Sequence, residues 1–455
     1  MNQFAPTVNI YTLGCKVNQY ESEAIGEALA ARGFDVRESE DTVCDFYIIN
    51  TCTVTAESDR KARQFIRRAL SHNPDAFILV TGCLAQVDAD SIRTIEGVDY
   101  VCGNKNKLDI VNAAVALRER GVKASAPTLS VDALDDATFE SMSIRHFART
   151  RAYIKIEDGC ENHCTYCIIP AARGQVRSKP LADVVREVRA LTESGCREVV
   201  LTGIETASWG RDFRRGANTE ADATPAPTLA DLLTAVDAID GIGRVRLGSL
   251  DPSLMRPAFV EKIAPLASLA PHFHLSMQSG SDRILARMKR KYNRTQALEA
   301  IERVRAALPQ VQFTTDMIVG FPGETDEDLE ATLDFARRAR FLAIHVFPYS
   351  RRAGTPAAAM PDQVPAATKR ERAAALSALA AAIRREILTD FAAQGTVRPV
   401  LFETWTDGVA TGHTPEFIEV RAPAPHSLHA VTREVCLNGV SEDGEACHGT
   451  LIDPL

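Results

Sequence analysis

The residues in this sequence best suited to chemistry are cysteines, and three of them share one short loop. Cys160, Cys164 and Cys167 stand in the segment CENHCTYC, directly after the apolar run AYIKIE. If that run is a strand of a parallel α/β fold, the loop lies at the carboxyl-terminal edge of the sheet, where such folds place their ligand sites. A cubane iron–sulfur cluster has four irons, so three thiolates leave one iron free to bind a small molecule. This first cysteine trio therefore predicts a [4Fe-4S] cluster with one open coordination position.

A zinc site is the alternative reading of the same loop. His163 would then be the fourth ligand, but it is adjacent to Cys164 in the chain. Two neighbouring side chains have difficulty turning into one tetrahedron. The spacing favours the cluster over zinc.

Three further cysteines each come immediately after a predicted strand. They are Cys15 in TLGCKVNQ, Cys52 in NTCTVT and Cys83 in TGCLAQ. Because a parallel sheet aligns its strand ends along one edge, these distant residues could converge on a second cluster, again with an open iron. A free cysteine is also a common core residue, so spacing alone is weaker evidence for this second cysteine trio than for the first.

The other cysteines lack such placement. We interpret Cys44, Cys102 and Cys196 as core residues, and assign no role to Cys436 or Cys447. Eleven cysteines dispersed through 455 residues do not predict a disulfide framework. In a reducing compartment, clustered thiols usually serve metal or redox chemistry.

The elements that must position the second trio belong to a predicted amino-terminal domain over residues 1–120. Short apolar runs alternate there with amphipathic stretches, which predicts a parallel α/β sheet. Helices are expected at about 19–32 and 57–70, and strands at VNIYTL, DFYIIN, FILVTG and VDYVCG. Residues 121–145 are expected to form a linker.

A second α/β domain is expected over residues 146–365. Six strand-like runs separated by helix-length segments predict an open, partial (β/α)6 barrel, smaller than the eight-unit version: AYIKIE, EVVLTG, RVRLGS, HFHLSMQ, FTTDMIVG and AIHVFPY. Residues 210–228 are typical of a solvated loop insertion. An Ala- and Arg-rich stretch predicts one long helix over 366–394, and strand-like runs with turns predict a small β-barrel over 395–455.

The composition is that of a globular protein, with 45% hydrophobic and 25% charged residues. No apolar run reaches the roughly 18 residues that a membrane crossing needs, and the first residues do not resemble a secretory signal. We therefore expect a cytoplasmic protein without a membrane partner. The net charge of −8 gives no overall attraction to nucleic acid, so an RNA site would need local basic patches.

Taken as whole strings, the motifs resemble the methylthiotransferase family of radical S-adenosylmethionine (SAM) enzymes over nearly the full length. The resemblance rests on TLGCKVNQYESE, NTCTVT, TGC, IEDGCENHCTYCIIPAARG, SMQSGSDRILARMKRKY, TDMIVGFPGET and HVFPYSRRAGTP. Three of them are most similar to the branch that modifies N6-threonylcarbamoyladenosine beside the tRNA anticodon: GCKVNQYES, DGCENHCTYCIIPAARG and VFPYSRRAGTP. The small β-barrel resembles the TRAM domain, an RNA-binding module.

The resemblance implies two [4Fe-4S] clusters and SAM as cofactors. The cluster on the first trio would cleave SAM and start radical chemistry at C2 of the target adenine. The cluster on the second trio would carry the sulfur that a second SAM methylates. The segment TGIET (202–206) takes the place of the methionine-binding segment, with Glu205 as a weaker candidate. The other matching SAM-binding candidates are Tyr166, Gln278, Ser279, Gly280, Asp316, Gly320 and Phe347.

The implied partners are a tRNA substrate, an electron donor such as flavodoxin or ferredoxin, and a sulfur source. Two basic runs could meet RNA phosphates or could form solvated helix faces: Arg60, Lys61, Arg63, Arg67 and Arg68, and Arg287, Lys289, Arg290, Lys291 and Arg294. The TRAM-like barrel departs from expectation, because from Phe391 onward it has no lysine, many acidic residues and only three arginines, Arg398, Arg421 and Arg433.

Two other functions stay open at this point. A methylthiotransferase could act instead on isopentenylated adenosine in tRNA or on an aspartate of a ribosomal protein. From a different class, a noncatalytic RNA-binding protein could use its clusters to sense redox state.

Overall fold

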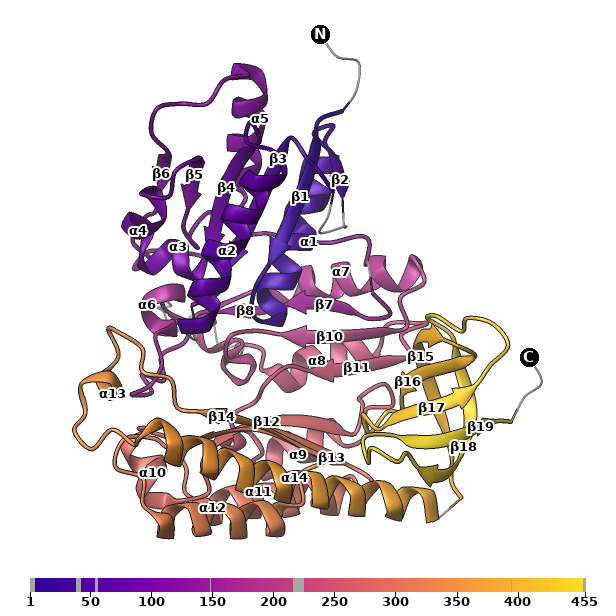
Figure 1. Ribbon diagram of the computed structural model, residues 1–455. Coiled ribbons are helices and arrows are strands. Elements are labelled where there is room, and N and C mark those ends of the chain that lie inside the picture. The colour runs from indigo at the N-terminus through magenta and orange to yellow at the C-terminus, as the bar shows by residue number, and fades with distance from the viewer. Residues whose placement is uncertain are drawn as a thin grey trace.

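The computed structural model describes residues 5–37, 42–53, 56–147, 149–215, 225–393 and 395–452. The chain forms an amino-terminal parallel sheet, a central open barrel and a carboxyl-terminal closed β-barrel (Figure 1). The α/β fold class expected from the sequence is confirmed. Among the described residues, none of the helices has the length and apolar character that a membrane crossing requires.

The amino-terminal sheet has the strand order β2-β1-β3-β4-β5-β6, and all its pairings are parallel. Helices cover both faces, so the central strands β3 and β4 are apolar on both sides rather than alternating. The elements are β1 (Thr7–Thr12), α1 (Lys16–Ala30), β2 (Asp35–Arg37), β3 (Phe46–Thr51), α2 (Ala56–His72), β4 (Phe77–Gly82), α3 (Cys83–Val87), α4 (Ala89–Arg93), β5 (Val98–Cys102), α5 (Asp109–Arg120) and β6 (Thr128–Ser130).

The strand β6 lies inside the segment that the sequence suggested as a linker. It extends the sheet by pairing with β5, from Tyr100–Thr128 to Cys102–Ser130. Three residues carry too short a pattern for period-based prediction, which explains why this strand was not anticipated. Further along the same segment, Met142 and Ile144 are buried in the core of the central barrel.

The central barrel is an arc of six parallel strands in the order β7-β10-β11-β12-β13-β14, left open between β7 and β14. It consists of two three-stranded halves that meet through the pairings Val245–Leu269 and Leu250–Leu275. The strands are β7 (Ala152–Lys155), β10 (Glu198–Thr202), β11 (Arg244–Leu247), β12 (His272–Gln278), β13 (Gln312–Val319) and β14 (Ala343–Pro348). The expected partial (β/α)6 barrel is therefore confirmed.

Short elements and outer helices connect these strands. They are the strands β8 (Glu157–Asp158) and β9 (Arg177–Ser178), and the helices α6 (Ile169–Arg173), α7 (Leu181–Glu193), α8 (Leu229–Asp237), α9 (Pro257–Ile263), α10 (Asp282–Arg287), α11 (Arg294–Ala307), α12 (Asp326–Ala339) and α13 (Pro356–Ala359). Reciprocal side-chain caps fix where several of them begin, as Thr325 and Asp328 do for α12. Of the expected loop insertion at 210–228, residues 211–214 form a short 3-10 helix, and 216–224 lie outside the described residues.

The long helix α14 (Ala366–Ala393) joins the central barrel to the terminal one (Figure 1). Its buried side chains, including Leu376, Ile383 and Ile387, pack where α14 meets β14 and the terminal strand β18. The closed barrel has the order β15-β16-β17-β19-β18. Its strands are β15 (Val397–Thr406), β16 (Val409–His413), β17 (Glu419–Pro423), β18 (Thr432–Val440) and β19 (Cys447–Leu451).

The terminal barrel closes the amino-terminal end of the central barrel. Arg246 on β11 donates hydrogen bonds to the carbonyls of Thr414 and Pro415, at 2.9 and 2.8 Å. The ring of Phe417 stacks on His272 at the start of β12, with centroids 4.7 Å apart. Removing the terminal barrel would therefore uncover the floor of the central barrel as well as any RNA-binding surface.

At the opposite end, a buried ionic network joins the amino-terminal sheet to the central barrel. Its centre is Arg173, the last residue of α6, which is fully buried. Arg173 donates to the carboxylate of Glu21 on α1 at 2.6 Å and to the side-chain oxygen of Asn18 at 2.5 Å. It also pairs with Asp158, and Lys155 pairs with both Glu21 and Asp158. The two domains thus share one set of buried charges.

The charges in this network hold each other ionised. Burial alone would lower the pKa of Arg173, but the charges of Cys83, Glu21 and Asp158 raise it well above its usual range. Burial acts in the opposite sense on Glu21, whose pKa nevertheless falls well below its usual range because Arg173, Lys107 and Lys155 surround it. Removing one member therefore leaves the others buried with incomplete neutralisation.

We predict that Arg173→Met lowers the free energy of unfolding by about 3 kcal/mol, because Glu21 and Asp158 lose a buried partner. Chemical denaturation followed by circular dichroism measures the change. The matched control is Arg186→Met, which removes an ion pair whose arginine side chain is 73% exposed, with an expected change of at most about 0.5 kcal/mol. Equal changes in the two variants would contradict a junction based on buried charge.

Candidate functional site

The first cysteine trio lies on the loop that follows β8, at the carboxyl-terminal end of the barrel strands. The amide of Cys160 donates to the carbonyl of Gly174 at 3.0 Å, and the amide of Cys167 donates to the carbonyl of Cys164 at 3.0 Å. Gly159 enters the loop with a φ of +87°, and a Cβ there would lie 1.9 Å from the Gln175 carbonyl oxygen. The close approach of the two backbones requires glycine, and it fixes the start of the cysteine loop.

The zinc reading of this loop has little geometric support. His163 is exposed and has a φ of 47°, in the left-handed region, whereas the adjacent Cys164 is buried. The two side chains therefore lie in different environments. The three cysteines are free thiols, as a cluster site requires.

Arg290 is a site residue that sequence reasoning missed. We grouped it with residues that could meet RNA, but its guanidinium is buried and lies 3.3 Å from the Cys164 sulfur. The same side chain pairs with Asp251 at 3.0 Å and donates to the Ser276 carbonyl at 2.9 Å. Spacing in the basic run gave no signal for this, because the direction of Arg290 is set by the turn after α10, where Lys289 has a positive φ.

Burial dominates the electrostatics of two thiols of the first trio, Cys160 and Cys167. It raises the pKa of Cys160 to about 12 and that of Cys167 to about 11. Arg290 partly opposes the shift at Cys167, whereas Cys164 and Cys83 add to it. Metal ligation by such thiols must therefore displace their protons, which the positive charge of bound iron favours.

The second cysteine trio comes together as the strand order predicts. Cys15 caps α1 directly after β1, Cys52 follows β3, and Cys83 begins α3 directly after β4. These three strands are neighbours in the sheet. A Cβ on Gly14 would lie 2.7 Å from the Cys52 Cβ, so the first two loops touch beside their cysteines.

The thiols of the second trio differ in exposure. Cys52 and Cys83 are buried, whereas Cys15 is exposed. Burial still raises the pKa of the Cys15 thiol, because protein surrounds it on most sides, and the charge of Cys83 adds to the shift. Cys15 therefore presents the accessible side of this trio.

Arg173 connects the Cys83 thiol of the second trio to the chain segment that follows the first trio. Its Nε lies 3.2 Å from the Cys83 sulfur, and its helix α6 begins two residues after Cys167. Cys83 is also close enough to Cys167 for its charge to contribute to the raised pKa there. The trios therefore occupy neighbouring edges of two domains rather than separate parts of the molecule.

A cavity of about 260 Å³ lies beside the first trio. Four of the SAM-binding residues expected from the sequence line it: Tyr166, Gln278, Asp316 and Phe347. Cys167 also reaches its wall, together with Ile318 and Tyr349. The structure thus places a thiol, aromatic rings and polar side chains around one cavity.

The other three expected SAM residues do not line this cavity. Ser279 lies 3.5 Å from the Thr332 hydroxyl, and a Cβ on Gly280 would lie 2.6 Å from the Phe335 Cβ. The amide of Gly320 donates to Glu324 at 2.8 Å. At these positions the residues make packing and turn contacts behind the cavity wall.

Two buried carboxyl groups lie behind the cysteine loop. Glu205 accepts a hydrogen bond from Asn162 at 3.2 Å, and its own amide donates to Glu157 at 2.8 Å. In the described part of the chain, Glu205 Oε1 and Glu157 Oε1 have no hydrogen-bond partner. Burial, and then the charge of Asp251, raises the pKa of Glu205 to about 7. An unpaired buried carboxyl oxygen beside a cysteine loop suits a cationic ligand.

Comparison with known sequences agrees with this arrangement. The Radical SAM superfamily matches residues 154–336, and the Uncharacterized protein family UPF0004 matches residues 7–103. The protein named threonylcarbamoyladenosine tRNA methylthiotransferase MtaB of Bacillus subtilis is 38% identical over 421 residues, covering 91% of this chain and 90% of that protein. The protein of the same name from Thermotoga maritima is 35% identical over 98% of both chains.

A second kind of relative matches over a similar length. The tRNA-2-methylthio-N(6)-dimethylallyladenosine synthase of Carboxydothermus hydrogenoformans is 36% identical and covers 87% of both chains. Among solved structures, the radical SAM methyltransferase TsrM of Kitasatospora setae has a TM-score of 0.56 at 17% identity, covering 78% of this chain and 77% of that one. This last likeness concerns the fold alone. The identities and coverage place this chain in the radical SAM methylthiotransferase family.

Proposed function

We propose that this protein adds a methylthio group to C2 of N6-threonylcarbamoyladenosine next to the tRNA anticodon. The observation that carries the proposal is the pair of cysteine trios joined by Arg173, with a cavity beside one of them. Sulfur insertion into an unreactive C–H bond needs a radical initiator and a sulfur carrier within reach of one substrate atom. The relatives named for the threonylcarbamoyl substrate support the choice of substrate.

The cysteines fit two [4Fe-4S] clusters, each with three thiolate ligands. When bound, the cluster on the first trio supplies the electron that cleaves SAM, and the cluster on the second trio holds the sulfur to be transferred. The Arg290 guanidinium would orient the Cys164 sulfur, and the Arg173 guanidinium places its positive charge beside the Cys83 sulfur. Each arginine is held beside its sulfur by an ion pair with a buried carboxylate.

The cavity beside the first trio is the proposed SAM site. Tyr166 and Phe347 would flank the adenine, whereas Gln278 and Asp316 would meet polar atoms of the nucleoside. Ser279, Gly280 and Gly320 would act from behind by shaping the wall. The free carboxyl oxygen of Glu205 would accept a hydrogen bond from the SAM ammonium.

We propose that the tRNA meets basic side chains on α2 and after α10. Lys61 and Arg60 are exposed on α2, and Lys291 is exposed after α10. Arg63 on the same helix is only partly exposed and donates to the Ser91 hydroxyl at 2.9 Å. The proposal includes a cytoplasmic location, a flavodoxin or ferredoxin as electron donor, and a separate sulfur source.

A second candidate substrate is isopentenylated adenosine, because relatives named for that substrate match almost as long a part of the chain. We predict that the reconstituted enzyme converts an anticodon stem-loop carrying threonylcarbamoyladenosine and leaves an isopentenylated one unchanged. Mass spectrometry of the digested nucleosides measures both products. Methylthiolation of only the isopentenylated stem-loop would reassign the substrate.

The two trios should have separable roles. We predict that Cys164→Ala abolishes SAM cleavage, because only two thiolates remain for the first cluster, whereas Cys52→Ala retains cleavage and loses methylthio transfer. The measurements are 5′-deoxyadenosine release, methylthio product, and iron content after anaerobic reconstitution. Cys436→Ala is the control, since this thiol lies in the terminal barrel and should change none of them. Identical behaviour of Cys164→Ala and Cys52→Ala would contradict the division of roles, and no 5′-deoxyadenosine from wild type would favour the redox-sensing alternative.

The affinity for SAM should depend on pH through Glu205. The pKa of this group is about 7, so it is mostly neutral near pH 6 and mostly ionised near pH 8. Because the ionised form attracts the SAM ammonium, we predict that SAM binds more tightly as the pH rises through about 7. Glu205→Gln should bind SAM about tenfold more weakly at about pH 8 and lose this dependence. Equilibrium dialysis measures the affinity, and an unchanged pH profile in Glu205→Gln would exclude this role.

A further inference from the structure

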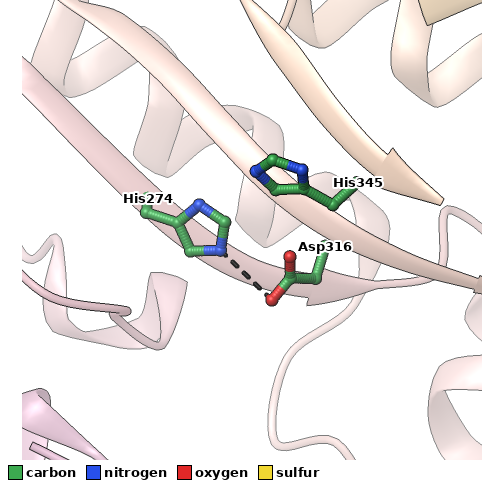
Figure 2. A group of neighbouring side chains, drawn as sticks. All are labelled: His274, Asp316 and His345. Atoms are coloured by element: carbon green, nitrogen blue, oxygen red, sulfur yellow. Dashed lines mark ion pairs between the residues drawn. The ribbon is translucent and has the colours of Figure 1, made fainter. Parts of the chain in front are cut away.

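Three polar side chains project into the interior of the central barrel from adjacent strands. They are His274 on β12, Asp316 on β13 and His345 on β14, and Figure 2 shows them turned toward one another. His274 Nε2 lies 3.2 Å from an Asp316 carboxylate oxygen, and the two imidazole rings are 5.8 Å apart. Asp316 and His345 are direct partners in the strand register. We call this set the lumen cluster.

The lumen cluster is held from behind and open in front. The Thr314 hydroxyl lies 2.9 Å from His274 Nδ1 and 3.1 Å from His272 Nε2, so the His274 ring has a fixed orientation. His345 is exposed, and Asp316 forms part of the wall of the proposed SAM cavity. The cluster therefore adjoins the SAM site on the barrel side and has groups free for a further ligand.

Lys16 brings positive charge to the same place. It is the first residue of α1 and directly follows Cys15 of the second trio. It lies close enough to Asp316, Arg151 and Arg246 for the charges to interact. Burial lowers the pKa of His345, and the charge of Lys16 adds to that effect, so His345 is neutral near pH 7 and can donate an N–H.

The cations around the cluster are unequally neutralised. Arg151 and Arg246 both pair with the buried carboxylate of Glu198. Among the described residues, no carboxylate lies within ion-pairing distance of the Lys16 ammonium. Lys16 is exposed, so its ammonium group, which has no such counter-charge in the described part of the chain, is available to an anionic ligand group at this position.

We propose that Lys16 and the lumen cluster form the pocket that receives the threonylcarbamoyl group of the substrate adenosine. The assignment rests on the proposed function, and it adds the residues that read the substrate. This group carries a carboxylate, a hydroxyl and a urea. The carboxylate would bind the Lys16 ammonium and an N–H of His345, and Asp316 would accept a hydrogen bond from the hydroxyl or a urea N–H.

The pocket would also explain discrimination between the two candidate nucleosides. An isopentenyl group has no polar atoms, so it would offer no anion to Lys16 and no hydrogen-bond donor to Asp316. Sites built for hydrogen bonding reject analogues that lack the bonding group more strongly than apolar pockets reject polar ones. Because Lys16 follows Cys15, the same contact would hold the adenine beside the sulfur-carrying trio.

Two histidines and one carboxylate could alternatively hold a divalent transition metal. Their candidate ligand atoms all lie within 4.8 Å of one another. The neighbouring charges of Lys16 and Arg246 weaken this reading, because they would repel a cation at the same position. A bound metal would be detected in wild type and lost in His345→Gln, so metal binding is one outcome of the test.

The test compares wild type, Lys16→Gln and His345→Gln as anaerobically reconstituted proteins. Fluorescence anisotropy measures binding of anticodon stem-loops that carry threonylcarbamoyladenosine, isopentenyladenosine or plain adenosine. We predict that each substitution weakens binding of the threonylcarbamoyl stem-loop at least about tenfold, the loss expected for one hydrogen bond to a charged group. Binding of plain adenosine should change less than about twofold. Lys262→Gln, an exposed lysine on α9, is the matched control.

Iron content and 5′-deoxyadenosine release without RNA establish that Lys16→Gln retains both clusters. Equal loss of affinity for all three stem-loops would overturn the pocket, since it would mean a general RNA contact. So would one equivalent of zinc or another divalent metal that is present in wild type and lost in His345→Gln. If wild type forms no methylthio product on threonylcarbamoyladenosine, the proposed function fails. If the product forms and the variants bind as wild type does, only this inference fails.

Discussion

The position of one buried guanidinium is the constraint on which the rest of the site depends. Arg173 belongs to the central barrel, but its nearest partners, Glu21, Asn18 and the Cys83 sulfur, belong to the amino-terminal domain. In this network the two carboxylates of Glu21 and Asp158 face four cations: Lys107, Lys155, Arg173 and Arg177. The surplus positive charge lies beside a thiol trio, where thiolates bound to iron would supply the missing negative charge. Docking of the domains and stabilisation of the second trio are therefore one electrostatic arrangement.

The sequence was informative where chemistry depends on local spacing or on strand ends. The loop from Cys160 to Cys167 could be predicted because its thiols are near in the chain. Cys15, Cys52 and Cys83 could be predicted because parallel strands end at one edge. Arg173, Arg290 and Lys16 could not be assigned, because the direction of each side chain depends on how one domain docks on another or how a turn is folded. The residue type alone does not indicate whether an arginine or lysine will contact a thiol of the protein or a phosphate of RNA.

The structural role of the terminal barrel could not be predicted from the sequence either. The small number of basic residues leaves its role in RNA binding open. Nothing in their spacing indicates that this barrel closes the central one. Phe417 stacks on His272 and lies under the guanidinium of Arg246, so a terminal loop forms part of the barrel floor. The strand β12 then carries His272 at that floor, His274 in the lumen and Gln278 at the cavity beside the first trio. One strand thus connects the terminal barrel to the reacting end, and mutations in the terminal barrel can act on the site without any contact to RNA.

Exposure within the second trio indicates the side from which a substrate must approach. Cys52 and Cys83 are enclosed by the sheet and by Arg173, which leaves Cys15 as the accessible thiol. The next residue, Lys16, is the amino-terminal residue of a helix that packs against β7 of the central barrel. In the proposed function, a base that reaches the open side of this trio would pass Lys16 and the lumen of the barrel. Because Asp316 belongs to the lumen and also lines the cavity beside the first trio, the same path would lead to the proposed SAM site. In the proposed function, the docking of the two domains would therefore bring the sulfur carrier and SAM to the end of one path.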